Sequence, residues 1–309
     1  MNQAAVTLVS AAPVPNLFVL GSCRVHRPVK LLQESGSARL YTSGINGYIH
    51  STREAAQRVR WLAERTGLDR QLLPFLFPAA RVPIVTPALA DELRTADLMV
   101  VEAAAERSVS VDGVFLQKNL VVRQLVRELG DEGMAWWRSL VRNGRVLPEA
   151  FEAVQPVFDH VIDDALKPAG ARVLRNAVCT EDTEDEVRAD LHYLSRVTGK
   201  PLLAVTHVDV ARPDGRKMVS RSRHVTRVKQ AAAGLPGVAV LDPLDIAQGW
   251  DEASLLDKEG ADVNHYSPRF EAVLADHMLD RVRAQLRHAG AARAGHHSFS
   301  FPEFQDGHE

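Results

Sequence analysis

Short, continuously apolar runs recur along the chain, and they constrain its fold more than any other sequence feature. The run Leu-Phe-Val-Leu at 17–20 is uninterrupted by polar residues, which suits a strand buried on both faces of a parallel sheet. Similar runs stand at 97–103, 201–208 and 237–243, and a weaker one stands at 38–43. The sequence therefore predicts a parallel sheet of about five strands.

Helical patterns separate these runs, which indicates an α/β protein with helices on both faces of the sheet. We expect a three-layer sandwich of the flavodoxin-like kind. The expected helices cover 52–66, 114–129, 148–166, 183–198, 219–233 and 269–288.

The distance between consecutive apolar runs predicts the domain organisation. We expect one α/β domain over residues 1–288 and a flexible tail over 289–309, where small residues dominate. The stretch from about 104 to 180 is too long for a simple crossover and is expected to form a mostly helical insertion. Such an insertion serves either as a lid over a site or as extra core.

Composition excludes several classes of function. The 309 residues carry a formal net charge of −2, which argues against non-specific nucleic-acid binding. Only two cysteines are present, Cys23 and Cys179, so no disulfide framework is implied. The N-terminal apolar stretch lacks a positive leader and is too short to cross a bilayer. We expect a cytoplasmic protein without membrane contact.

Polar residues cluster directly after the expected strands, where open parallel sheets bind their ligands. Gly21, Ser22 and Cys23 follow the first strand, and "GADVNHYSP" at 260–268 precedes the last helix. The other candidates at strand ends are Ser43, Gly44, Asn46, Gly47, Glu102, His207, Asp209 and Asp242.

The Gly-Ser-Cys turn and the Asp-x-x-His pair near the C-terminus resemble the SGNH/GDSL hydrolase superfamily, and the turn is similar to its GSCFA branch. The resemblance implies that Cys23 is the nucleophile, with His265 and Asp262 completing a triad. It also implies oxyanion donors: the Cys23 N–H and a glycine after the second strand, Gly44 or Gly47. Ala103 and Ala104 stand where the superfamily has a third donor, so Asn46 is the expected substitute.

The same residue types make chemical sense together. A thiol attacks as the thiolate, and an imidazole can take its proton while a carboxylate orients the imidazole. Arg24, with His26 and Arg27, adds positive charge that favours a thiolate or binds an anionic part of a substrate. His207 is expected to line the pocket. A metal site formed by His207, Asp209 and His265 matches no ligand spacing, so none is predicted.

These residues predict a cysteine acyltransferase or (thio)esterase that carries the acyl group on Cys23 and passes it on in the tailoring of a polysaccharide or secondary metabolite. No cofactor is required. The expected co-substrate is an acyl thioester of coenzyme A or of a carrier protein, together with a small-molecule acceptor, and a homo-oligomer is compatible with this reading. Two alternatives stay open: a non-catalytic protein that binds a nucleotide or coenzyme A, and a serine esterase that uses Ser22.

Overall fold

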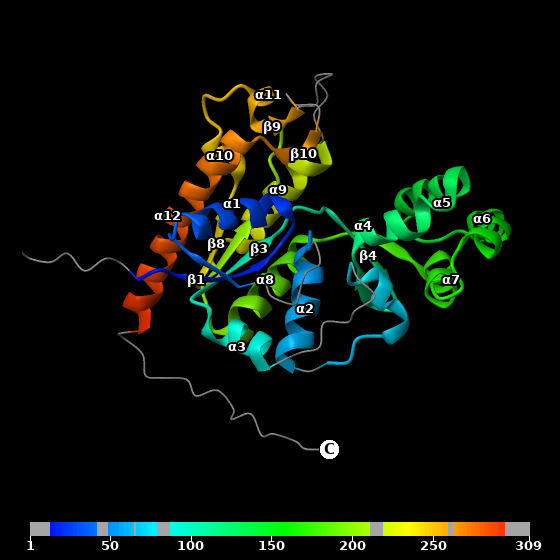
Figure 1. Cartoon of the computed structure of the whole chain (residues 1–309), viewed down its shortest axis with the longest axis horizontal. Coiled ribbons are helices and arrows are strands. Elements are labelled where there is room, and N and C mark those ends of the chain that lie inside the picture. The colour runs from blue at the N-terminus through cyan, green and yellow to red at the C-terminus, as the bar shows by residue number, and fades with distance from the viewer. Residues whose placement is uncertain are drawn as a thin grey trace, which may run out of the picture.

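A five-stranded parallel sheet forms the centre of the molecule (Figure 1). The structure is a computed structural model and describes residues 13–41, 49–64, 66–78, 87–210, 219–258 and 262–293. The strand order is β2-β1-β3-β7-β8, and every neighbouring pair is parallel. The strands are β1 (Asn16–Leu20), β2 (Arg39–Tyr41), β3 (Leu98–Glu102), β7 (Leu202–Val205) and β8 (Val238–Leu241). They coincide with the five predicted runs, so the predicted sheet is confirmed.

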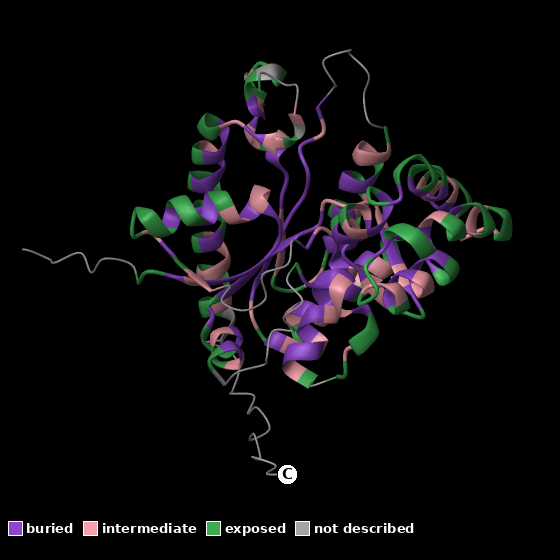
Figure 2. Ribbon diagram, turned by 45° about the vertical axis from the view of Figure 1, so that its right-hand side comes forward, coloured by how far each residue is buried: buried purple, intermediate pink, exposed green. Residues whose placement is uncertain are grey.

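Alternate residues of each strand face two separate hydrophobic cores. Leu17 and Val19 of β1 pack with helices α1 (Cys23–Glu34) and α12 (Pro268–Arg293). Phe18 and Leu20 belong to the other core. That core includes residues of α2 (Thr52–Glu64), α3 (Pro87–Thr95), α8 (Glu184–Thr198) and α9 (Val219–Ala232). Helices on both faces of the sheet confirm the three-layer sandwich. The central strands β1, β3 and β7 are almost entirely buried (purple in Figure 2), whereas the edge strands β2 and β8 are partly exposed.

The chain between β3 and α8 forms an insertion to one side of the sheet, on the right in Figure 1. It contains the helices expected there and, unexpectedly, a three-stranded antiparallel sheet in the order β5-β4-β6. Its strands are β4 (Arg107–Val111), β5 (Val114–Leu116) and β6 (Val178–Glu181). Its helices are α4 (Lys118–Val121), the π-helical turn η2 (Val122–Val126), α5 (Gly130–Asn143), α6 (Pro148–Val161) and α7 (Lys167–Asn176).

The prediction of a helix over 114–129 is wrong in its first part, where the chain forms β5. Asp112 and Gly113 both have positive φ, 51° and 80°, and they connect β4 to β5 as a two-residue hairpin loop. An Asp-Gly pair favours this tight turn because glycine, and to a lesser degree aspartate, tolerate the left-handed region. Val111 pairs with Val114 across the turn.

The C-terminal part returns to the sheet and brings the predicted Asp-x-x-His segment with it. After β8 come α10 (Pro243–Ile246), α11 (Glu252–Leu255) and the hairpin of β9 (Leu256–Asp257) with β10 (Asp262–Tyr266). The short 3₁₀ helix η1 (Arg70–Phe75) follows α2 earlier in the chain. Helix α12 continues to Arg293, beyond the predicted start of the tail at 289, and residues 294–309 lie outside the described part. None of the helices in the described ranges is both long enough and apolar enough to cross a membrane.

A carboxyl group is buried at the end of the insertion, just before α8. Asp182 lies between β6 and α8, is 2% exposed, and accepts a hydrogen bond of 2.9 Å from the Ser108 hydroxyl of β4. Burial raises the pKa of Asp182 to about 7, although the Ser108 hydrogen bond and the Arg53 charge act in the opposite direction. The folded state therefore favours the protonated form of this carboxyl group.

We expect the stability of the protein to depend on the ionisation of Asp182. Because its folded pKa is raised, its contribution is complete below the unfolded pKa and is lost as the pH rises through about 7. Between pH 5 and pH 8, Asp182→Asn should gain on the order of 1 to 3 kcal/mol of unfolding free energy relative to the wild type. Urea unfolding at both pH values measures this, and an equal pH dependence in both proteins would contradict it.

Candidate active site

The first and third strands leave the sheet side by side, and the predicted site lies where they end. β1 pairs with β2 on one side and with β3 on the other, so the chain reverses its direction of winding at this point. Ligands of such sheets bind outside the carboxyl ends of the strands at this switch point. Gly21, Ser22 and Cys23 follow β1 here, and Glu102 ends β3.

The turn after β1 is packed tightly against Glu102. A side chain at Gly21 would place its Cβ 3.2 Å from the Glu102 Cβ and 3.0 Å from that of Val25, so only glycine fits without movement. Ser22 caps α1, because its hydroxyl oxygen accepts a hydrogen bond of 3.3 Å from the Arg24 N–H. The backbone N–H of Ser22 donates to Glu102. Cys23 is therefore fixed as the first residue of α1.

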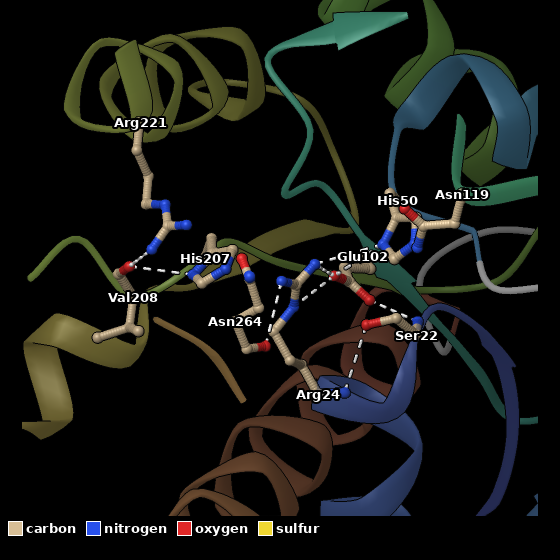
Figure 3. Close-up of polar contacts among 9 residues, drawn as sticks. All are labelled: Ser22, Arg24, His50, Glu102, Asn119, His207, Val208, Arg221 and Asn264. Carbon is tan, nitrogen blue, oxygen red and sulfur yellow. Dashed lines mark hydrogen bonds and ion pairs between the residues drawn. The ribbon is translucent and has the colours of Figure 1, made fainter. Parts of the chain in front are cut away.

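Arg24 and Glu102 form a buried ion pair beneath this turn (Figure 3). The Arg24 Nε lies 2.9 Å from Glu102 Oε1, and the side chains are only 11% and 1% exposed. Burial by itself raises the pKa of Glu102, but the charges of Arg24 and His50 outweigh it and hold that pKa well below its usual range. Glu102 is therefore ionised, and the Arg24 guanidinium, expected to bind substrate, is held by this carboxylate.

His50 and Asn119 complete the network, and neither was predicted from the sequence. His50 precedes α2, and its Nδ1 lies 3.3 Å from Arg24 and 3.7 Å from Glu102. Its Nε2 lies 2.9 Å from the Asn119 side-chain nitrogen of α4. The only signal for His50 is its place in the loop after the second strand. Asn119 has no comparable signal, since it arrives at the site through the insertion.

Asp262 and His265 form the predicted pair near the C-terminus. The Asp262 Oδ2 lies 2.8 Å from the His265 Nδ1, and Asp262 also accepts a hydrogen bond of 3.0 Å from the Asn264 N–H. Residues three apart in a regular strand point to opposite faces, but the pairing of β10 with β9 shifts register between Asp262 and Tyr266. This irregularity lets the carboxylate and the imidazole meet.

One hydrogen bond joins this segment to the N-terminal turn. Arg24 donates to the Asn264 carbonyl at 3.4 Å, so the residues beside Cys23 and His265 are in direct contact. In the described part of the chain no hydrogen bond joins Cys23 itself to His265. The structure thus brings both ends of the predicted triad to one edge of the sheet, and the triad stays a prediction.

The environment of Cys23 favours the neutral thiol. Burial is the largest influence and raises the pKa of this half-buried residue above its ordinary value. The charges of Arg24 and Arg27 lower it, whereas Glu102 raises it. The positive charge expected to favour a thiolate is therefore outweighed in this state. Attack by Cys23 requires a base.

His207, at the end of β7, is a buried hydrogen-bond acceptor. Its Nδ1 lies 3.0 Å from the Val208 carbonyl, which can only accept, so Nδ1 carries the proton and Nε2 keeps a lone pair. No described residue is bonded to that Nε2. Burial, followed by the charges of Arg24 and Arg221, lowers the pKa of His207 well below its ordinary value. This imidazole is therefore neutral, and its Nε2 lone pair is buried without a partner among the described residues.

Three predicted residues, Gly44, Asn46 and Gly47, lie outside the described residues, so their predicted oxyanion role is untested. Within the described ranges no group of histidine, cysteine and carboxylate side chains has the arrangement of a metal site.

The buried ion pair generates a stability prediction. Arg24→Met and Glu102→Gln should each lower the unfolding free energy by about 3 to 5 kcal/mol, because each leaves one charged partner buried without its counter-ion. The double variant should lose much less than the sum of the two. Urea unfolding of the four proteins gives the coupling energy.

The exposed pair Arg94–Asp91 serves as the control for this cycle. Its side chains are 57% and 62% exposed at a separation of 3.1 Å, so Arg94→Met should change stability by less than about 1 kcal/mol. Additive losses from the Arg24 and Glu102 variants would show that the two residues are not coupled.

Comparison with known proteins gives two matches. The family model described as "TviD N-terminal domain" matches residues 15–281, a range that contains both the turn at Cys23 and the Asp262–His265 pair. A curated relative, the "Vi polysaccharide biosynthesis protein TviD" of Salmonella typhi, is 24% identical over 274 residues, which is 87% of this chain. The aligned region amounts to 32% of that relative's length.

Proposed function

Because the chain belongs to the TviD N-terminal domain family, we propose that it acts in polysaccharide tailoring as an SGNH-like acyltransferase with Cys23 as its nucleophile. The similarity to a protein of Vi polysaccharide biosynthesis supports the polysaccharide as the class of acceptor. The chain's own residues support the acyl-transfer chemistry.

The Asp262–His265 pair is the observation that carries this proposal. A carboxylate 2.8 Å from Nδ1 fixes the imidazole tautomer, so that Nε2 is free to accept a proton. The His265 side chain is 38% exposed, which leaves it accessible to a substrate. The contact between Arg24 and the Asn264 carbonyl puts this pair next to the Cys23 turn.

The turn geometry favours Cys23 over Ser22 as the nucleophile. Ser22 is 2% exposed, and its hydroxyl oxygen already accepts the Arg24 N–H as the helix cap. Cys23 is more accessible and stands at the positive end of the α1 dipole, which stabilises negative charge as it develops on sulfur. We therefore assign Ser22 to the cap and Cys23 to the attack.

The first half-reaction transfers the acyl group to the protein. The Cys23 sulfur attacks the carbonyl carbon of an acyl thioester while His265 takes the thiol proton. The tetrahedral intermediate collapses, the donor thiolate leaves, and His265 returns the proton to it. The Cys23 N–H, at the first turn of α1, has no intrahelical partner and is placed to donate to the oxyanion.

The second half-reaction releases the acyl group. A hydroxyl of the acceptor attacks the Cys23 thioester, and His265 takes the hydroxyl proton. Collapse of the second intermediate expels the Cys23 sulfur, which recovers that proton. Water in place of the sugar hydroxyl gives a (thio)esterase. No step requires a cofactor.

Acyl loading tests the proposal directly. We expect the protein incubated with acetyl-coenzyme A to gain one acetyl group on Cys23, seen by mass spectrometry of intact protein and peptides. Cys23→Ala should abolish this loading. His265→Ala should slow it by about 10² to 10⁴, and Asp262→Asn should slow it as well, because the imidazole loses its orientation.

The same experiment separates the rival functions. An acetyl group on Ser22 would replace this proposal with a serine esterase. Thermal stabilisation by coenzyme A without acyl loading would favour a binding protein, a reading that the raised pKa of Cys23 also supports. Cys179, which is buried, serves as the internal control for non-specific acylation.

The raised pKa of Cys23 also predicts its reactivity without substrate. Since burial and Glu102 disfavour the thiolate, iodoacetamide should modify Cys23 with a midpoint above that of a free cysteine, ~8.5. Arg27→Gln should raise the midpoint further, because Arg27 lowers this pKa in the wild type. A midpoint below that of a free cysteine would show instead that a preformed thiolate exists at rest.

A further inference from the structure

His50 is a point at which the insertion meets the candidate active site. Its backbone carbonyl accepts hydrogen bonds from the Ala104 and Ala105 N–H groups, at 2.9 and 2.8 Å, where the chain leaves β3 for the insertion. Its side chain lies 2.9 Å from the amide nitrogen of Asn119 on α4. The insertion is therefore bonded to the backbone and to the side chain of this one residue.

The other side of the His50 ring faces the ion pair beneath the Cys23 turn (Figure 3). The Nδ1 atom lies 3.3 Å from Arg24 Nη2 and 3.7 Å from Glu102 Oε1. Arg24 Nη2 donates to that same Oε1 atom, so the guanidinium and the imidazole converge on one carboxylate oxygen. His50 thus stands between Asn119 of the insertion and the ion pair that holds the turn.

The contacts of the ring decide where its proton lies. The Asn119 amide nitrogen can only donate, so Nε2 accepts and carries no proton. The single proton then lies on Nδ1, the nitrogen nearer to Glu102, where it favours the carboxylate. In agreement with this orientation, His50 lowers the pKa of Glu102. Asn119 therefore selects the tautomer of His50 that faces the ion pair.

Helix α4 is anchored independently of this contact, so Asn119 is held in place. The Gln117 N–H donates to the Phe75 carbonyl of η1 at 2.9 Å, and the Gln117 side chain caps the helix by accepting from the Leu120 N–H at 2.6 Å. Leu120 and Val121 are buried. The amide of Asn119 thus reaches His50 from a fixed support.

Exposure distinguishes the Asn119 contact from ordinary core packing. Asn119 is exposed, whereas the side chains of His50 and Glu102 are 14% and 1% exposed. Water could satisfy an exposed amide almost as well, so this hydrogen bond adds little to the stability of the fold. Its main consequence is the orientation of the buried imidazole.

We propose that Asn119 and His50 are positioning residues through which the insertion holds the Cys23 turn in its reactive arrangement. Asn119 orients the His50 ring, and the ring in turn orients the ion pair beneath the turn. The effect on acyl transfer rests on the proposed function, whereas the arrangement of hydrogen bonds does not. The insertion then braces the nucleophile in addition to enlarging the core.

The rate of acetyl loading on Cys23 tests the proposal. Asn119→Ala should slow loading at saturating acetyl-coenzyme A by about tenfold or more, because a small displacement of a reacting group has a large kinetic cost. The concentration of acetyl-coenzyme A that gives half-maximal loading should change by less than about twofold, since Asn119 acts on the turn and not on the donor. An unchanged loading rate would overturn the proposal.

A double-mutant cycle separates positioning through His50 from a direct effect of Asn119. His50→Asn keeps an amide donor near the place of Nδ1 and has no acceptor in place of Nε2. Asn119→Ala should therefore cause no further loss in the His50→Asn protein, as expected of residues that act as a unit. Additive losses from the two substitutions would contradict the proposal.

The matched control is Asn143→Ala on α5. Asn143 is another exposed asparagine of the insertion, and its amide donates to Ser139, one turn earlier in the same helix. Loading should stay at the wild-type rate in this variant. Equal slowing in the Asn119 and Asn143 variants would show a general effect on the insertion and would refute positioning through His50.

Heteronuclear NMR of the histidine side chains gives a readout that does not depend on catalysis. The His50 signals, identified by their loss in His50→Asn, should show the proton on Nδ1 in the wild type and lose this preference in Asn119→Ala. A proton on Nε2 in the wild type, or an unchanged tautomer in the variant, would overturn the proposal.

The two readouts distinguish failure of this inference from failure of the proposed function. If Asn119→Ala changes the His50 tautomer but wild-type Cys23 never acquires an acetyl group, the link between Asn119 and His50 stands and the acyltransferase chemistry falls. If Cys23 loads equally fast in the wild type and in Asn119→Ala, the acyltransferase stands and the positioning role falls.

Discussion

The buried Arg24–Glu102 pair is the interaction on which the candidate site depends. It connects the turn after β1, the end of β3, the loop before α2 and the segment of His265. Taking two charges out of water costs free energy that their attraction seldom repays in full. The main effect of the pair is therefore to hold the turn after β1 in place, because the carboxylate accepts hydrogen bonds from both the Ser22 N–H and the Arg24 guanidinium.

This arrangement explains why a network of charged residues surrounds a thiol that is itself neutral. Burial raises the pKa of Cys23 more than any other influence, and Glu102 opposes the lowering by the Arg24 charge. In the proposed reaction, proton removal then falls to His265, which stands with its partner Asp262 on β10. The nucleophile and its base thus belong to opposite ends of the chain, which meet where Arg24 donates to the Asn264 carbonyl and Arg27 pairs with Glu271.

The fold was largely predictable because its signals are local. Apolar runs such as Leu17–Leu20 have no place except inside a sheet covered on both sides, and their order then decides which residues meet at the carboxyl edge. The Asp-Gly turn at 112–113 was an equally local signal for a hairpin, and the helical pattern around it led to the wrong expectation.

The candidate site was predictable only in part, because several of its contacts are long-range. The Asp262–His265 pair was predicted from its Asp-x-x-His spacing and the family resemblance, yet its geometry depends on a register shift that no sequence pattern announces. Asn119 reaches His50 only because the insertion brings α4 to this edge of the sheet.

The neutral state of Cys23 has a consequence for the lifetime of the protein. Peroxides oxidise the thiolate far more readily than the thiol, and sulfinic and sulfonic acids formed in this way are largely irreversible. A cysteine whose burial and carboxylate neighbour keep it protonated is shielded from this damage while no substrate is present. The features that keep the Cys23 thiol unreactive without substrate therefore also protect it from oxidation between turnovers.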